Sequence, residues 1–274
     1  MKPKVFFTKK ITPEKVVELY DALGIDLPGK VAVKVHSGEK GNQNFLHPDF
    51  WAPMVEKVQG TVVECNTAYG DFDVDLMDAE GPDDVLPVPG GKVLKTNLVG
   101  KHMQTYDARL VLAHFKGHPA GGFGGALKQL SIGCASSRGK ALIHSGGFTD
   151  SNIDTWKHHA PQDTFCEAMA DAASTVAKFF EGKIAYISVM KNLSVDCDCC
   201  AVAEDPCMKD IGILASLDPV AIDQAGLDLV YAATDDPGQR HFLDRVESRH
   251  GVHTVEAAAD LGFGSREYEF IELE

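Results

Sequence analysis

Long apolar segments are absent from this 274-residue chain, and no run approaches the ~18 apolar residues that a membrane-spanning helix needs. Basic residues are also scarce, because 26 lysines and arginines stand against 40 aspartates and glutamates, for a formal net charge of -14. Such a surface repels nucleic acid phosphates and anionic lipid headgroups at long range. We therefore expect neither a nucleic acid nor a membrane as a partner.

The start of the chain lacks the apolar core of a secretory signal, since its apolar run is only Val5-Phe6-Phe7. We therefore expect a cytoplasmic protein, in which the seven cysteines stay reduced and available for metal binding or chemistry. The C-x2-C-x2-C spacing of ferredoxins is also missing. Cysteine spacing alone therefore does not identify a metal.

Apolar runs that alternate with helical patterns indicate the fold class. Residues 31–35, 61–65, 109–115 and 184–190 resemble buried strands, and helical spacing of apolar residues marks 48–58, 163–180 and 218–231. Strands that alternate with helices predict an α/β fold with a mostly parallel sheet and helices on both faces. We expect one domain over residues 1–274, with a boundary between two lobes in the acidic, proline-bounded segment near residues 71–90.

The densest group of cysteines lies near residue 200. Cys197 and Cys199 would point the same way in an extended segment, and a turn would bring Cys200 or Cys207 to the same place. Cys134, which follows a glycine, is a further candidate ligand. Four sulfur ligands suit zinc or an iron-sulfur centre. Redox-active thiols and simple packing are the alternative explanations for these cysteines.

Polar residues also follow the strand at 109–115. If that strand continues, His114, Lys116 and His118 face one side at its carboxyl end, where ligands of open α/β sheets bind. The segment after it is a glycine loop and a helix start, which would turn backbone N–H groups toward an anionic substrate. The residues that we expect to bind this substrate here are Gly122, Gly124, Gly125 and Lys128.

Two neighbouring strands end in similar chemistry. Lys34, His36 and Glu39 follow the strand at 31–35, and Asn66 follows the strand at 61–65. Because the carboxyl ends of parallel strands meet at one edge, we expect a single cleft. In this cleft Lys34 and Asn66 would bind the substrate. The acid-base groups would be His36, Glu39, His114, Lys116 and His118, although hydrogen-bonded structural roles also explain such residues.

Several strings in this chain, taken in order, resemble the domain-of-unknown-function 362 (DUF362) family, whose members are often described as uncharacterised iron-sulfur centre proteins. The strings are VAVKVHSGE at 31–39, VECNTAY at 63–69, HFKGH at 114–118, GGFGGALK at 121–128, DCDC at 196–199 and DIGILASLDPVAID at 210–223. The resemblance implies that Cys197 and Cys199 belong to the site. The ferredoxin-like cysteine insert of many relatives, expected between His144 and Phe165, is missing, and the segment after Gly70 is short.

The leading hypothesis is a metalloprotein that acts as an oxidoreductase on a small anionic substrate, with an electron-transfer partner. The cofactor would be an iron-sulfur cluster or a single metal ion, either iron or zinc. One alternative is a zinc-dependent hydrolase or lyase that uses the same cleft. A second alternative is a non-catalytic metal-binding protein in which the cysteines stabilise a turn.

Overall fold

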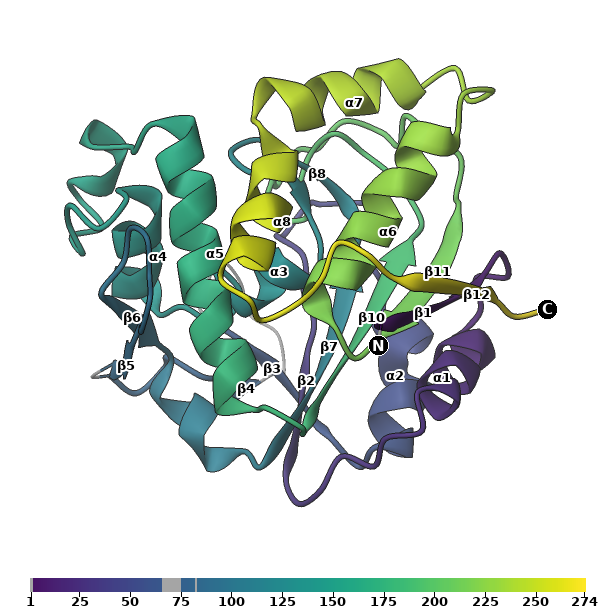
Figure 1. Ribbon diagram of the computed structural model, residues 1–274, viewed down its shortest axis with the longest axis horizontal. Helices are drawn as coiled ribbons and strands as arrows, with labels where there is room; N and C mark the ends of the chain where they lie inside the picture. Colours follow the sequence, from purple (N-terminus) through teal and green to yellow (C-terminus); the bar gives the residue numbers. More distant parts are fainter. Residues whose placement is uncertain (1, 66–74, 82) are drawn as a thin grey trace.

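The computed structural model describes residues 2–65, 75–81 and 83–274 (Figure 1). Its main sheet has eight strands in the order β12-β1-β11-β10-β7-β2-β3-β4. Every described strand of this sheet except β11 runs in one direction. The expected α/β fold with a mostly parallel sheet is thus confirmed. The strands are β1 (Lys4–Thr8), β2 (Val31–Lys34), β3 (Thr61–Glu64), β4 (Asp75–Leu76), β7 (Ala108–His114), β10 (Ile184–Met190), β11 (Gly212–Ser216) and β12 (Glu269–Glu272).

Helices cover both faces of the sheet because side chains on its strands alternate between two apolar cores. On one face, Leu110 and Ile187 pack with α1 (Pro13–Ala22) and α2 (Pro48–Lys57). On the other face, Val111 and Tyr186 pack with a larger group of helices, of which α5, α6 and α8 lie in front of the sheet in Figure 1. The remaining α-helices are α3 (Ala126–Leu130), α4 (Ser137–His144), α5 (Gln162–Phe179), α6 (Pro219–Ala232), α7 (Gln239–Ser248) and α8 (Gly251–Asp260).

Short elements complete the described part of the chain. Two small antiparallel sheets pair β5 (Asp84–Pro87) with β6 (Thr96–Val99), and β8 (Lys116–His118) with β9 (Gly122–Gly124). Two 3₁₀ helices span Lys101–Thr105 and Thr155–Lys157. Within the described residues, no helix is both long and apolar enough to span a membrane. The expected lobe boundary near 71–90 includes residues 71–74 and 82, which lie outside the described part.

The strand expected at 109–115 does not continue into residues 116–118, a possibility that the sequence left open. β7 ends at His114, and Lys116–His118 form a separate strand that pairs with β9 in a hairpin. This hairpin runs close to the segment that precedes the cysteines, since Gly117 N donates to Ser194 O at 2.7 Å. A Cβ at Gly117 would lie 2.3 Å from Val195 O, so only glycine allows the approach.

Candidate metal centre

The site lies where parallel strands end. β2, β7 and β10 run side by side in one direction, so the segments after Lys34, His114 and Met190 leave the sheet at the same edge. Ligands of open α/β sheets bind at this edge. The segment after β10 carries the cysteines, and its neighbours supply the groups that surround them.

Cys197, Cys199 and His36 form the group that could hold a metal ion. One ligand atom from each lies within 4.8 Å of the others, and no other such group is found in the part of the chain that the structure describes. His36 Nε2 lies 3.8 Å from the buried Cys197 Sγ. Thiolate and imidazole suit zinc and iron, so the donor set fits the expected class of cofactor. A hydrogen bond to Cys199 lowers the pKa of Cys200 to about 7, so Cys200 is next to this group.

The Cys197 thiol is surrounded by hydrogen-bond donors. Lys128 Nζ donates to Cys197 Sγ at 3.2 Å. Burial alone would raise the pKa of Cys197, but a hydrogen bond with Cys199 and the positive charges of Lys128 and Lys116 hold that pKa well below the usual thiol value. These surroundings favour the thiolate form of Cys197, which is the form that binds metals and attacks electrophiles.

His118 belongs to the same surroundings. Its Nδ1 accepts hydrogen bonds from the backbone N–H groups of Ala120 and Gly121, at 3.2 and 2.8 Å. Burial and the positive charge of Lys128 lower the pKa of His118 to about 4, while its interaction with Cys197 opposes this shift. The imidazole is therefore neutral with its proton on Nε2, so it is a donor toward the thiolate.

Asp198 binds two of the residues that the sequence assigned to the site. Its carboxylate lies 2.9 Å from His114 Nδ1 and 2.7 Å from Lys116 Nζ. His114 Nε2 lies 2.6 Å from Lys191 O, so both ring nitrogens face hydrogen-bond acceptors. Burial raises the pKa of Asp198, but His114 and Lys116 outweigh burial and hold it well below its usual value. The sequence analysis did not select Asp198.

Lys34 is also paired inside the protein. Its Nζ contacts Glu64 Oε1 and donates to Gln129 Oε1 at 2.8 Å. Burial raises the pKa of Glu64, but Lys34 and His36 outweigh this effect and hold it below its usual value. Lys34, Lys116 and Lys128 thus each contact an anionic group of the chain. Glu64 ends β3, which pairs with β2 as the sequence predicted for these neighbouring strands, but the sequence analysis selected Asn66 and not Glu64 at this strand end.

Three amide side chains hold the loop after β2 against the cysteine loop. Asn42 Nδ2 donates to Cys200 O at 2.9 Å, Gln43 Nε2 to Ala203 O at 3.0 Å, and Asn44 Nδ2 to Glu204 O at 2.8 Å. Glu39 N donates to Asp198 O at 2.8 Å from the same loop. The sequence analysis missed these amides, whose partners lie more than 150 residues away. Their contacts bring His36 to Cys197.

The backbone N–H groups that follow the glycine loop bind a side chain of the protein, and not a substrate anion as the sequence predicted. The N–H groups of Ala126 and Leu127, at the start of α3, donate to the two carboxylate oxygens of Asp223 at 2.7 and 2.9 Å. A Cβ at Gly125 would lie 2.3 Å from Asp223 Oδ1. Gly122 and Gly124 form β9. Because a side chain of α6 already occupies the helix start, these N–H groups are not available to a substrate anion.

Asp223 leads to a prediction about pH. Burial raises the pKa of Asp223 to about 7, although the N–H groups of Leu127 and Ala126 act in the opposite direction. A carboxyl with a raised pKa in the folded state stabilises the fold below the unfolded pKa and loses this contribution as pH rises through the folded value. We expect the unfolding free energy of the wild type, relative to Asp223→Asn, to fall by about 2–4 kcal/mol between pH of about 4 and about 7.

Urea unfolding of both proteins across this pH range measures the difference. Asp228→Asn, on the exposed side of the same helix, is the matched control and is expected to show no such dependence. A constant difference between the wild type and Asp223→Asn over the whole range would contradict the prediction.

Other predicted site residues lie outside the group. Cys134 Sγ accepts a hydrogen bond from Arg109 Nη1 at 2.6 Å and donates to Gln129 O, and Cys207 Sγ donates to Leu193 O at 3.4 Å. Neither belongs to the metal-ligand group formed by the described residues. Asn66 lies outside the described residues. The Oε2 atom of Glu39 is buried and has no hydrogen-bond partner among the described residues.

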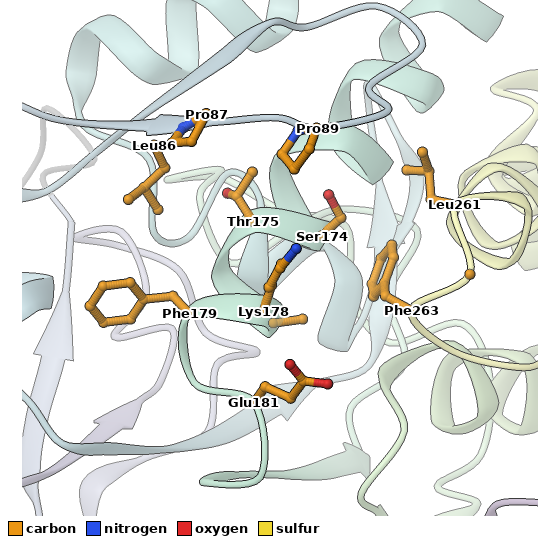
Figure 2. A pocket seen from close by; sticks show the side chains of 12 residues that line it. Leu86, Pro87, Pro89, Ser174, Thr175, Lys178, Phe179, Glu181, Leu261 and Phe263 are labelled. Atoms are coloured by element: carbon orange, nitrogen blue, oxygen red, sulfur yellow. The ribbon is translucent and has the colours of Figure 1, made fainter.

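Of two hollows on the protein, one lies at the same edge of the sheet as this site and the other lies away from the predicted site residues. One, of about 320 Å³, lies beside the ends of β1 and β10 and is lined by Thr12, His47, Asp49, Phe50, Lys191 and Asn192, among others. The other, of about 660 Å³, lies between the β5 segment, the end of α5 and the residues after α8 (Figure 2). Leu86, Phe179 and Phe263 line it, and it contains none of the predicted site residues.

Comparison with known proteins adds a family and distant structural similarity. The sequence model of the family described as "Domain of unknown function (DUF362)" matches residues 31–228. A Thermotoga maritima protein solved by the Northeast Structural Genomics Consortium is 12% identical, with a TM-score of 0.40, over 91% of this chain and 59% of that chain. The lactate racemase apoprotein from Thermoanaerobacterium thermosaccharolyticum is 13% identical, with a TM-score of 0.36, over 67% of this chain and 50% of that chain. This chain therefore spans less than two thirds of either structure. No curated protein matches it.

Proposed function

The chain belongs to the DUF362 family, and we propose that it is a metal-dependent oxidoreductase whose Cys197, Cys199 and His36 hold an iron-sulfur cluster or a single iron ion. The observation that carries this proposal is the grouping of the three ligand atoms within 4.8 Å. Cys200 is the nearest further thiol in the sequence. When bound, such a centre supplies one-electron chemistry, and an electron-transfer partner would then be required.

Positive groups at the site favour an anionic thiolate centre. Lys128 donates a hydrogen bond to Cys197. Lys116 forms an ion pair with Asp198, the residue that follows Cys197 in the chain. Hydrogen bonds and nearby cations stabilise thiolate-bound centres and raise their reduction potentials. These lysines therefore support the metal site, and they do not remain as free anchors for a substrate.

A small anionic substrate is proposed to bind in the hollow of about 320 Å³ at the same edge of the sheet. Lys191 lines this hollow, and its Nζ lies 5.6 Å from the centroid of the Phe50 ring. The backbone oxygen of Lys191 contacts His114, which joins the hollow to Asp198 and the cysteine loop. An ammonium group that faces a cavity attracts a carboxylate or phosphate.

Proton transfer is assigned to Glu39. The ring nitrogens of His114 face Asp198 and Lys191 O, and His118 Nδ1 accepts from Ala120 N and Gly121 N, so these nitrogens already have partners within the protein. Glu39 Oε2 is buried and has no partner among the described residues. Glu39 N donates to Asp198 O, between the two cysteines, so this buried oxygen is proposed to accept a proton at the metal centre and not in the hollow.

The test is anaerobic purification, followed by elemental analysis and visible spectra of the same sample before and after dithionite. We expect iron and sulfide, with an absorption band near ~400 nm that dithionite bleaches, as for thiolate-bound clusters. Iron without sulfide would indicate a single ion. A sample without metal, after purification under anaerobic conditions, would overturn the proposal.

A second candidate function is a zinc-dependent hydrolase or lyase. The presence of an imidazole beside two thiols favours it, because two cysteines and one histidine with an open position also form catalytic zinc sites. Zinc would lower the pKa of a bound water. A colourless sample that contains zinc and no iron would support this candidate and exclude the redox function.

A further inference from the structure

The carboxylate of Glu64 is held on one side and unsatisfied on the other. Oε1 contacts Lys34 Nζ and accepts a hydrogen bond from Cys65 N at 3.1 Å. Oε2 is buried and has no hydrogen-bond partner among the described residues. His36 Nδ1 lies 4.0 Å from Oε2. An unsatisfied buried carboxylate oxygen is costly, so a donor for it is expected in the working state of the protein.

The ring of His36 explains which donor this is. In the structure Nδ1 accepts from Gly38 N at 3.2 Å, so the ring proton is on Nε2, which faces Cys197 Sγ at 3.8 Å. A histidine that binds a metal through Nε2 must carry its proton on Nδ1 instead. The N–H of Gly38 can then no longer donate to Nδ1, and the acceptor on that side is Glu64 Oε2.

We propose that Glu64 is a positioning residue that accepts the Nδ1 proton of metal-bound His36 and fixes Nε2 toward Cys197 and Cys199. This inference rests on the proposed metal site. Lys34 keeps Glu64 ionised and in place, because its ammonium also contacts Val35 O at 2.6 Å and Gln129 Oε1 at 2.8 Å. Carboxylates that orient a ligating histidine in this way raise its basicity and its affinity for the metal.

A double-mutant cycle with cobalt(II) tests the inference, because thiolate-bound cobalt is visible in absorption spectra. Cobalt is titrated into the wild type, Glu64→Gln, His36→Cys and the double variant. In the presence of His36, Glu64→Gln is expected to weaken cobalt binding by about 10–100-fold. In the His36→Cys background the same change is expected to alter affinity by no more than about twofold, since the effect acts through the imidazole.

The outcomes separate this inference from the proposed function. If the wild type binds no cobalt, the metal site itself is wrong. If the wild type binds cobalt and Glu64→Gln binds equally well, or loses affinity equally in both backgrounds, only the role of Glu64 is overturned. Glu64→Asp keeps the counter-charge of Lys34 but withdraws the carboxylate from His36, so it replaces Glu64→Gln in the cycle if the latter does not fold.

A second measurement needs no variant. In the zinc-loaded wild type, long-range ¹H–¹⁵N spectra report which nitrogen of His36 carries the proton. We expect the proton on Nδ1, and in the metal-free protein we expect it on Nε2. A proton that remains on Nε2 after zinc binding would overturn the inference.

Discussion

Replacing Cys197 and Cys199 together with serine is expected to remove the bound metal from the protein. These residues supply two of the three ligand atoms in the group, and Lys128 donates a hydrogen bond to Cys197. Outer groups that only orient a ligand contribute about 10–100-fold to metal affinity, so loss of two ligands should exceed about 100-fold. Elemental analysis after anaerobic purification, with the visible spectrum of the same sample, measures the effect.

Cysteines outside the group provide the controls. Cys166 contacts the backbone of Arg249 and His250, and Cys207 contacts Leu193 O, so Cys166→Ser and Cys207→Ser should keep the wild-type metal content. Full metal content in the Cys197→Ser, Cys199→Ser double variant would show that the metal lies elsewhere. Loss of metal from Cys207→Ser alone would place a fourth ligand at that position.

Asp198→Asn is expected to destabilise the fold by about 3–5 kcal/mol, because it leaves the buried Lys116 ammonium without its counter-charge and removes the carboxylate partner of the buried His114. Asp198, His114 and Lys116 are all almost completely buried. The pKa of Asp198 is lowered, so its contribution is present above the ordinary carboxyl pKa and is lost as pH falls through the folded value. Urea unfolding at neutral pH gives the free-energy difference.

Asp196→Asn is the matched control for this experiment. Asp196 lies two residues earlier in the same loop, is partly exposed and pairs with Arg245 at 3.2 Å. Partly exposed pairs of this kind contribute about 1 kcal/mol or less. Equal losses of stability in the two variants would show that the buried pairs of Asp198 do not carry the effect.

The order of strands and helices could be predicted from local patterns. Long apolar runs such as 109–115 and 184–190 become β7 and β10, and the helical pattern at 163–180 becomes α5 (Gln162–Phe179). These patterns are local because a strand or helix buries its apolar side chains with a fixed period. Parallel connections then bring the strand ends to one edge, which is why residues near Lys34 and His114 were expected together.

The partners of each site residue depended on contacts between distant loops. The sequence predicted that Lys34, Lys116 and the glycine loop would bind an anion, but Glu64, Asp198 and Asp223 occupy them. It left open whether the strand at 109–115 continues past His114, and the structure has a separate hairpin there. The ion pairs of a buried site form between side chains that only folding brings into contact. The spacing of apolar residues along the sequence does not show which side chains these are.

By itself, the sequence determined the alternation of strands and helices, the mostly parallel sheet, the family and the local pairing of Cys197 with Cys199. Only the tertiary structure decided that His36, 161 residues away, faces Cys197, and that Glu64 lies behind His36. The physical reason is the range of the interactions. Backbone periods act over a few residues, whereas hydrogen bonds and ion pairs form wherever folding brings donor and acceptor within about 3 Å.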